Sequence, residues 1–241
     1  MAREAGSGHA GPGEQLSLVL DGRQEATGQL PRRLLPMIPA MGEGPFDDER
    51  YFFEPWWPGA PTIASIEGGH LRLQTEHLAD PLAMFPELGV IAEQVDGDGV
   101  VVDGTLLVLD AEGRPDTELL RLRLSDPQAG GGEAAFVASD LLWLGGSPLI
   151  DRPFSERRER LGDVLRDGRL CVASRGLRGE GIMLAEAVAS MGLTEISARS
   201  WTGTYRPGPA GDDWLRLPIV ESPAAETRPL LVLLSRLPLE A

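Results

Sequence analysis

The chain has 241 residues, 42% of them hydrophobic, with a formal net charge of −15 at pH 7. All 22 basic residues are arginine, because the sequence contains no lysine. Arginine keeps its charge at physiological pH, so the composition excludes mechanisms that need a lysine amine as nucleophile. The acidic balance argues against unaided binding to the phosphates of DNA. The length is enough for one large domain or two small ones with a sizeable core.

Cysteine content and hydropathy place further limits on the class of protein. The single Cys171 excludes an internal disulfide and a cysteine-based metal cluster. No apolar stretch reaches membrane-spanning length, and the N-terminus has no apolar secretory core. We therefore predict a cytoplasmic protein that does not bind membranes.

The N-terminal part of the chain is rich in Gly, Pro and acidic residues. Residues 1–28 are predicted to be a loose leader with one apolar run, Leu16–Leu20, that could form a strand. Pro31–Pro45 is expected to be an extended approach to a single domain that spans residues 29–241. The first strand of the domain body is predicted at Tyr51–Glu54.

Strand signals dominate the first half of the domain. Thr62–Glu67 and His70–Gln74 flank Gly68-Gly69, which predicts a hairpin with a two-residue turn. Leu82–Ala92 is predicted to be a short helix because a proline stands near its start. Further strands are predicted at Val100–Asp103, Leu106–Asp110 and Phe136–Leu144, with a turn at Glu112–Pro115.

Helical signals appear in the second half. Ser155 follows Pro153 and is predicted to cap a helix that runs to Leu165. Gly179–Met191 has the pattern of an amphipathic helix that ends at Gly192. Short strands are predicted at Glu195–Trp201, Trp214–Val220 and Leu230–Leu234. The pattern indicates an α+β fold, in which helices pack against antiparallel sheets.

No independent catalytic motif is found in the sequence. The three histidines, His9, His70 and His77, have no metal-ligand partner at helical spacing. Gly130–Gly132 lacks the Lys and Ser/Thr of a phosphate-binding loop and is interpreted as a flexible loop.

Several short segments nevertheless follow one another in a recognisable order. They are Pro36-Met37, Glu54–Gly59, Phe85–Leu88, Val102–Leu106, Gly113–Pro115, Asp140–Leu144, Leu149–Pro153, Ser155–Arg158, Met191–Leu193, Tyr205–Gly208 and Trp214–Leu217. From about Leu30 to Leu217, this order resembles the adenylation domain of ATP-dependent DNA ligases. The part from Asp140 to Arg158 is most similar to the bacterial, repair-type ligases.

The resemblance implies an ATP-grasp-like nucleotidyltransferase fold that uses ATP, magnesium and a nucleophilic lysine. In the family, this lysine precedes an aromatic residue, Asp and Gly. Its position here is Trp56, followed by Trp57, Pro58 and Gly59. An indole has no nucleophilic lone pair, and its bulk would occupy the AMP site. We therefore predict a catalytically inactive pseudoenzyme that uses neither ATP nor magnesium.

Other functional positions of the family also hold different residues. The arginine after the family's Gly becomes Pro61, and the last lysine becomes Pro218. The acidic residue after Asp103-Gly104 becomes Thr105, and the adenine-stacking aromatic before Asp140 becomes Ser139. A second family arginine is replaced at Glu76, a glutamate at Thr194, and two lysines at Arg199 and Arg216. The positions of the predicted vestigial nucleotide cleft are Glu54, Trp56, Gly59, Glu76, Asp103, Thr105, Ser139, Thr194, Arg199 and Arg216.

A full ligase of this family continues into an oligonucleotide-binding (OB) barrel, and too few residues follow Leu217 for one to be expected. The leading hypothesis is an inactive homologue that binds a protein partner, possibly in DNA repair. Trp56 and Trp57 could form an exposed interface, or they could fill the former cleft as part of the core. Alternatives are a weak nucleotide or phosphate sensor that uses Arg199, Arg216 and Asp103, residual ligase activity, and weak binding to nicked DNA.

Overall fold

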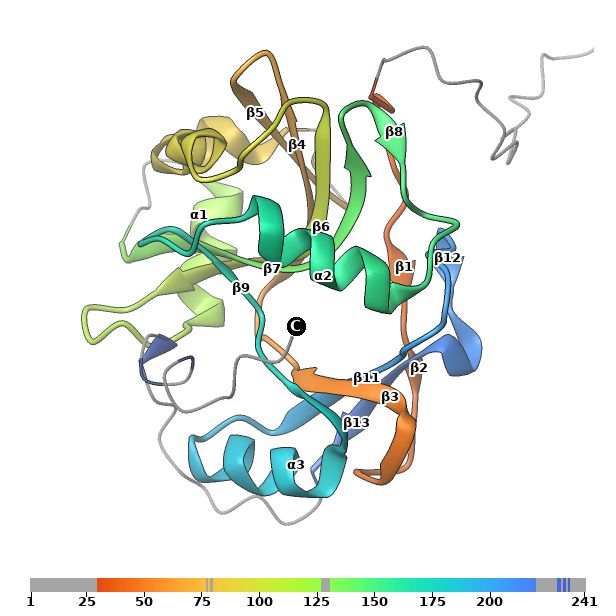
Figure 1. Cartoon of the computed structure of the whole chain (residues 1–241). Helices are drawn as coiled ribbons and strands as arrows, with labels where there is room; N and C mark the ends of the chain where they lie inside the picture. The colour runs from red at the N-terminus through yellow and green to blue at the C-terminus, as the bar shows by residue number, and fades with distance from the viewer. Residues whose placement is uncertain are drawn as a thin grey trace, which may run out of the picture.

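The computed structural model describes residues 30–76, 78, 80–126, 131–219, 229, 230, 232 and 234. The predicted leader, with its strand at Leu16–Leu20, lies outside the described residues. Two main β-sheets form the body of the domain, and helices pack against them (Figure 1). The predicted α+β class is confirmed. None of the helices within the described part of the chain is long and apolar enough to cross a membrane.

The larger sheet has six strands. Its order is β5-β4-β6-β7-β8, with β9 beside β7. The bounds are Ala60–Glu67 (β4), His70–Thr75 (β5), Val100–Leu109 (β6), Glu133–Leu144 (β7), Ser147–Pro148 (β8) and Cys171–Ala173 (β9). Gly68 and Gly69 form the predicted hairpin turn with φ of 59° and 74°, values that glycine adopts without strain.

The second sheet has five strands in the order β10-β3-β11-β13-β2. The bounds are Ala40–Met41 (β2), Asp47–Pro55 (β3), Leu177–Glu180 (β10), Glu195–Ser200 (β11) and Trp214–Pro218 (β13). A two-stranded sheet joins β1 (Met37–Ile38) to β12 (Gly208–Pro209). Most pairs are antiparallel as predicted, but β1–β12, β2–β13 and β7–β9 are parallel.

The helices cover the sheets and close the core. α2 (Phe154–Val164) packs against β7, and α3 (Gly181–Ser190) packs against β3 and β11 (Figure 1). α1 (Thr117–Ser125) packs against β6. The 3-10 helices are η1 (Pro81–Met84), η2 (Pro86–Glu93) and η3 (Gly211–Asp213).

Several predicted elements differ in detail from the observed ones. The helix expected at Leu82–Ala92 is two 3-10 helices, because Phe85 leaves helical geometry (φ −134°) and the proline after it has no N–H to donate. The strands Val100–Asp103 and Leu106–Asp110 are one strand, β6, with a register shift inside it. The residues described after 228 include three helical ones, Leu230, Val232 and Leu234, so the strand predicted there is wrong.

One helix start was predicted incorrectly, and one helix was missed. The N-cap of α2 is Pro153, without a side-chain hydrogen bond, and not Ser155. The prediction missed α1, although Asp116 caps it by accepting from the N–H groups of Glu118 and Leu119. Gly192 takes φ of 84° after α3, as a residue that ends a helix does.

Residues 30–44, which we call the N-terminal strap, run in extended form from one sheet to the other. Near β5, Gln74 exchanges two hydrogen bonds with the backbone of Leu34, at 3.1 and 2.6 Å. Further along, the N–H of Met37 donates to the hydroxyl of Tyr205 at 2.9 Å. The strap then pairs with β12 and with β13, as the strand running down the right-hand side of Figure 1 shows. The predicted extended approach segment is therefore confirmed.

Candidate functional site between the two sheets

Asp140 is the centre of a buried charged cluster that joins the two sheets. This residue of β7 is fully buried, and both of its carboxylate oxygens accept from Arg157 of α2, each at 2.8 Å. Arg199 of β11 donates to the same carboxylate at 3.0 Å. One aspartate thus connects the six-stranded sheet, a helix and the five-stranded sheet. Two guanidinium partners compensate the loss of hydration of the buried carboxylate.

Arg199 has further partners on its own sheet. Its Nε lies 3.6 Å from Oε1 of Glu54, which is 2% exposed on the neighbouring strand β3. The guanidinium carbon lies 4.0 Å from the ring centroid of Trp214, across from it on β13. Glu54, Arg199 and Trp214 thus lie on one face of adjacent strands. There, Arg199 forms an ion pair with Glu54 and a cation–π contact with Trp214. Arg199 therefore contacts Asp140, Glu54 and Trp214 within the protein.

Trp56, predicted from the sequence to stand at the nucleophile position, follows directly after β3. Its backbone N–H donates to the carbonyl of Glu195 at 3.1 Å, which fixes this point of the chain against β11. The indole is half-buried, with the guanidinium carbon of Arg216 at 4.6 Å from its centroid and the ring of Trp214 at 6.0 Å. Arg216 itself is paired with Glu195, with Nε–Oε1 at 2.8 Å.

Trp57 lies in the core of the domain. Its side chain is 4% exposed, and its Nε1 donates to the hydroxyl of Ser174 at 3.0 Å. An exposed pair of tryptophans was one of two alternatives, and it is wrong for Trp57. The other alternative, that the tryptophans fill the interior, describes Trp57 fully and Trp56 in part.

Asp103 of β6 is the second buried aspartate of the site. Its carboxylate accepts from the hydroxyl of Tyr205 at 3.1 Å, and its side chain is in register with Asp140 on the adjacent strand. Burial raises the pKa of Asp103 to about 6; Arg199 and Tyr205 oppose this rise, while Asp140 and Glu54 add to it. The carboxyl group is therefore half protonated near pH 6.

The remaining predicted positions divide into two groups. Ser139 is 6% exposed at the register shift of β7, directly before Asp140. Gly59 and Thr105 lie side by side, since a Cβ on Gly59 would come within 2.7 Å of Cγ2 of Thr105. The side chains of Glu76 and Thr194 are exposed and lie outside the buried cluster.

Sequence reasoning missed several members of this cluster: Asp140, Arg157, Arg158, Tyr205 and Trp214. Arg157 and Arg158 are 2% and 5% exposed, although charges at helical spacing suggest a solvated face. Arg158 lies over the ring of Phe52 at 5.3 Å and donates to the carbonyl of Ser174. The signal that could have found Arg157 is the helix start after Pro153, which turns this arginine towards the buried Asp140.

The arrangement sets limits on the chemistry of the site. Three arginines (157, 158 and 199) face three carboxyl groups (54, 103 and 140), so the cluster is close to neutral when all are charged. Within the described residues, no group of three or more His, Cys, Asp or Glu side chains could hold a metal ion. Oε2 of Glu54, Nη1 of Arg158 and Nε of Arg199 are buried without a hydrogen-bond partner among the protein atoms described. The cluster thus combines internal ion pairs with three buried polar atoms that lack a partner, and it contains no amine.

Comparison with known proteins relates this fold to one class of enzymes. No family model matches the chain. It is 27% identical over 187 residues to the multifunctional non-homologous end joining protein LigD of Mycolicibacterium smegmatis, covering 77% of this chain and 24% of LigD. It is 24% identical over 182 residues to the SPbeta prophage-derived DNA ligase-like protein LigB of Bacillus subtilis, covering 76% of this chain and 66% of LigB. The chain thus spans about a quarter of the length of that LigD.

Solved structures give the same result. Mycobacterial DNA ligase D complexed with ATP and MES superposes with a TM-score of 0.66 and 26% identity, over 78% of this chain and 60% of that one. The Chlorella virus DNA ligase-adenylate shares the fold at a TM-score of 0.54 and 12% identity, over 77% of this chain and 67% of that one. The homologues of this chain are LigD ligase domains and DNA ligases, and its structural neighbours are the adenylation domains of ATP-dependent DNA ligases.

Proposed function

We propose that this DNA ligase adenylation-domain homologue does not capture AMP, and that it acts by binding a protein partner. The observation that carries the proposal is Trp56, the residue at the position of the family's nucleophile. Its indole contacts Arg216 and Trp214, so the position holds an aromatic ring and no amine.

The other charged groups of the site support the same conclusion. Covalent nucleotidyl transfer needs cations that are available to phosphate groups. Here Arg199 pairs with Asp140 and Glu54, and Arg216 pairs with Glu195. A nucleotide would have to displace these carboxylates, and Ser139 offers no aromatic surface for a purine. These residues do not fit ATP, and the engaged carboxylates do not fit magnesium.

A nucleotide or phosphate sensor is the weaker alternative for the same reason. Asp103, Arg199 and Arg216 were the residues that could have formed it, and all three have protein partners. DNA binding has little support, since the formal net charge of −15 opposes a polyanion. A gel-shift assay with nicked DNA at low and at moderate salt should show no complex at moderate salt.

Covalent labelling tests the proposal directly. The protein is incubated with ATP labelled at the α-phosphate and with magnesium, then precipitated with acid and counted. We expect no acid-stable label, whereas the ligase domain of mycobacterial DNA ligase D serves as the positive control. A labelled band from this chain would refute the proposal, because it would require a nucleophile other than lysine. Calorimetric titration with ATP, AMP and NAD should give no heat at millimolar ligand.

The names of the relatives indicate the cellular process in which a partner would act. Several are named as multifunctional non-homologous end joining proteins. We therefore propose a partner in DNA repair, with the retained domain serving as a protein-binding scaffold. Cross-linking of the tagged protein in its own cells, followed by mass spectrometry, should identify a repair protein. Recovery of cross-links only to unrelated proteins would contradict this assignment.

A further inference from the structure

An apolar hollow lies at the free edge of the five-stranded sheet, on the side away from the charged cluster. It has a volume of about 490 Å³. Leu215 lies beside Trp214 and Arg216 on β13, and alternation along a strand turns its side chain to the opposite face of the sheet. We call this hollow the edge groove, and its lining residues are Gly42, Glu43, Gly44, Pro45, Phe46, Leu215 and Leu217.

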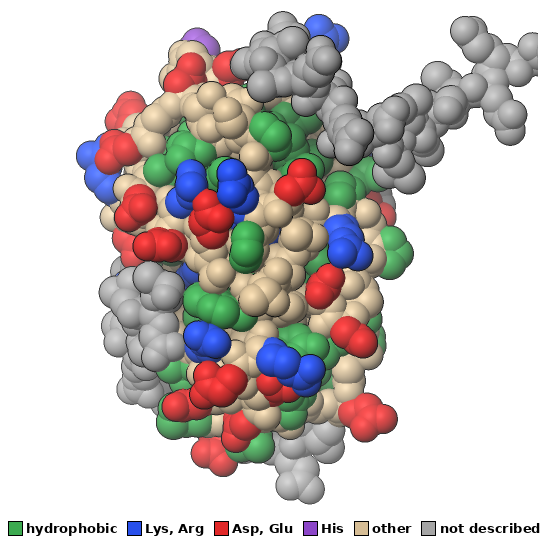
Figure 2. All heavy atoms as spheres, turned by 45° about the vertical axis from the view of Figure 1, so that its right-hand side comes forward, with side chains coloured by type: hydrophobic (Ala, Val, Ile, Leu, Met, Phe, Trp, Pro, Cys, Tyr) green, Lys and Arg blue, Asp and Glu red, His purple; other side chains and the backbone are tan. Residues whose placement is uncertain are grey.

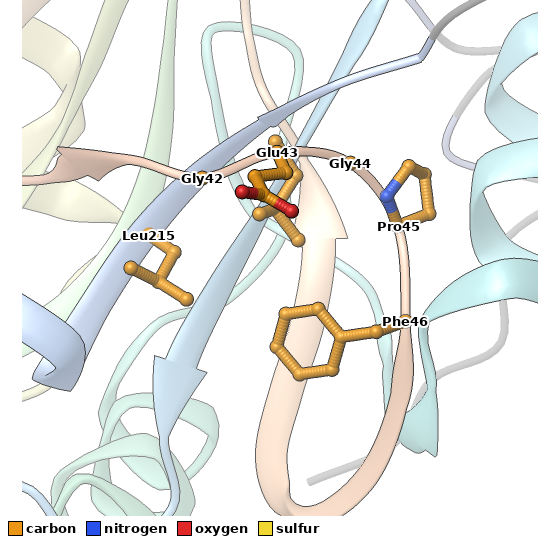
Figure 3. Close-up of a pocket in the computed structure, with 7 residues that line it drawn as sticks. Gly42, Glu43, Gly44, Pro45, Phe46 and Leu215 are labelled. Carbon is orange, nitrogen blue, oxygen red and sulfur yellow. The ribbon is translucent and has the colours of Figure 1, made fainter.

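The groove has an apolar floor that continues beyond the hollow itself. Figure 3 shows Leu215 of β13 and the ring of Phe46 bordering one space, with the carboxylate of Glu43 beside them. Phe46 makes an edge-to-face contact with Tyr51 at 5.3 Å between centroids. All three apolar side chains are only half-buried, although they pack against the hydrophobic core. They therefore offer a supported surface on which a further apolar group could be buried.

The rim of the groove is acidic. Glu43 is exposed on one side, and the exposed Asp47 follows directly after Phe46. The hydroxyl of Tyr51, whose ring contacts Phe46, donates to the backbone carbonyl of Asp212 at 3.0 Å, so Asp212 and its neighbour Asp213 lie near Tyr51. Among the described residues these four carboxylates form no ion pair, but Asp47 accepts a hydrogen bond from the N–H of Ile182 in α3 at 2.9 Å. Figure 2 shows acidic side chains, with some arginines among them, scattered between hydrophobic ones on the side of the molecule that is at the right in Figure 1.

These charges select between possible occupants. A nucleic acid or an anionic membrane would be repelled by the rim, and a second copy would bring its own acidic groove to the contact. A basic segment gains from the rim and from the formal net charge of −15, which attracts it over longer distances. An apolar side chain within that segment would be buried on the floor of the groove.

We propose that the edge groove binds a segment of another protein that places an apolar side chain in the hollow and arginine or lysine side chains against the acidic rim. This inference rests on the proposed role in partner binding, and it specifies the surface and the chemistry of the partner. It is independent of the loss of adenylation, which concerns the opposite face of the same sheet.

The test uses nuclear magnetic resonance titration of the full chain with three synthetic peptides. The first carries one leucine between arginines, the second has serine in place of the leucine, and the third has glutamates in place of the arginines. We expect saturable shifts at Gly42, Gly44 and Phe46 with the first peptide. Loss of the leucine should weaken binding by about tenfold or more, the value of one buried apolar side chain. The glutamate peptide should give no shifts, and added salt should weaken the first peptide.

Two variants and a matched control locate the binding. Glu43→Arg and Leu215→Gln should each weaken the first peptide by about tenfold, while their spectra confirm that they fold. Val90→Gln replaces an exposed apolar side chain (47%) on η2, which packs against β5, and should bind like the wild type.

Equal shifts with the serine peptide, shifts confined to other residues, or no shifts at millimolar peptide would each overturn the proposal. So would a dimer that forms through the groove, detected by sedimentation and abolished by Leu215→Gln. None of these outcomes would change the result of the ATP-labelling experiment. The proposed peptide binding at the edge groove and the proposed loss of adenylation can therefore be refuted separately.

Discussion

Replacing Asp103 by asparagine isolates the electrostatic cost of a carboxylate between the two sheets. Burial raises the pKa of Asp103 to about 6 from its ordinary 3.8, so folding takes up a proton between these values. The difference corresponds to about 3 kcal/mol over the full range, and to about 2 kcal/mol between pH 4.5 and pH 7.5. The sign follows from the direction of the change. The folded state holds the proton more tightly, so this contribution to stability is present at low pH and is lost as the pH rises through about 6.

The assay is urea denaturation followed by tryptophan fluorescence, across this pH range, for the wild type and Asp103→Asn. Asparagine cannot titrate, so the variant lacks this component while the other carboxyl groups contribute similarly to both proteins. Relative to the variant, the wild type should lose about 2 kcal/mol from the low to the high end of the range. A stability difference that stays constant with pH would refute the reasoning, as would one that changes in the opposite direction.

Three further substitutions test the site and the packing around it. Arg157→Met should destabilise the protein by about 3–5 kcal/mol in urea, because it leaves the central carboxylate short of a buried partner, whereas Arg121→Met at an exposed pair should cost at most about 1 kcal/mol. Gly59→Ala should lower the melting temperature by several degrees, since its Cβ would meet a backbone oxygen at 2.3 Å; Gly89→Ala, with open space around it, should not. Trp56→Lys should remain unlabelled by ATP, because an amine alone does not free the engaged arginines, and a labelled variant would mean that the site has lost only its nucleophile.

The main strands could be predicted because their signals are local. Gly68-Gly69 defines a hairpin whose glycines have the positive φ values that the turn needs, and the predicted strand Phe136–Leu144 lies within β7. The strand predicted at Leu230–Leu234 failed because a short apolar run fits a buried helix equally well. Local pattern also gave no reason to join the two halves of β6, whose register shift depends on its neighbour β7.

The candidate site was predicted only in part, for a related reason. Among the positions carried over from the family, Glu54 and Arg199 form an ion pair, and both Arg199 and Trp56 contact Trp214. These positions did not predict which contacts would take the place of the family's interactions, because those contacts join residues that are far apart in the sequence. Arg157 and Asp140 are 17 residues apart, and Arg199 and Asp140 are 59 apart. Such pairings become visible only when the sheets are packed against each other.

The N-terminal strap has a consequence for the order in which the chain can fold. Its partners lie near the other end of the sequence, since the contact between Met37 and Tyr205 spans 168 residues. The five-stranded sheet likewise combines strands from residues 40–55 with strands from residues 177–218. During synthesis, β2 and β3 therefore leave the ribosome long before their neighbours exist. The edges of β2 and β3 stay unpaired until almost the whole domain has been synthesised. Formation of this sheet is therefore a late and slow step of folding, during which chaperones would protect the unpaired strands.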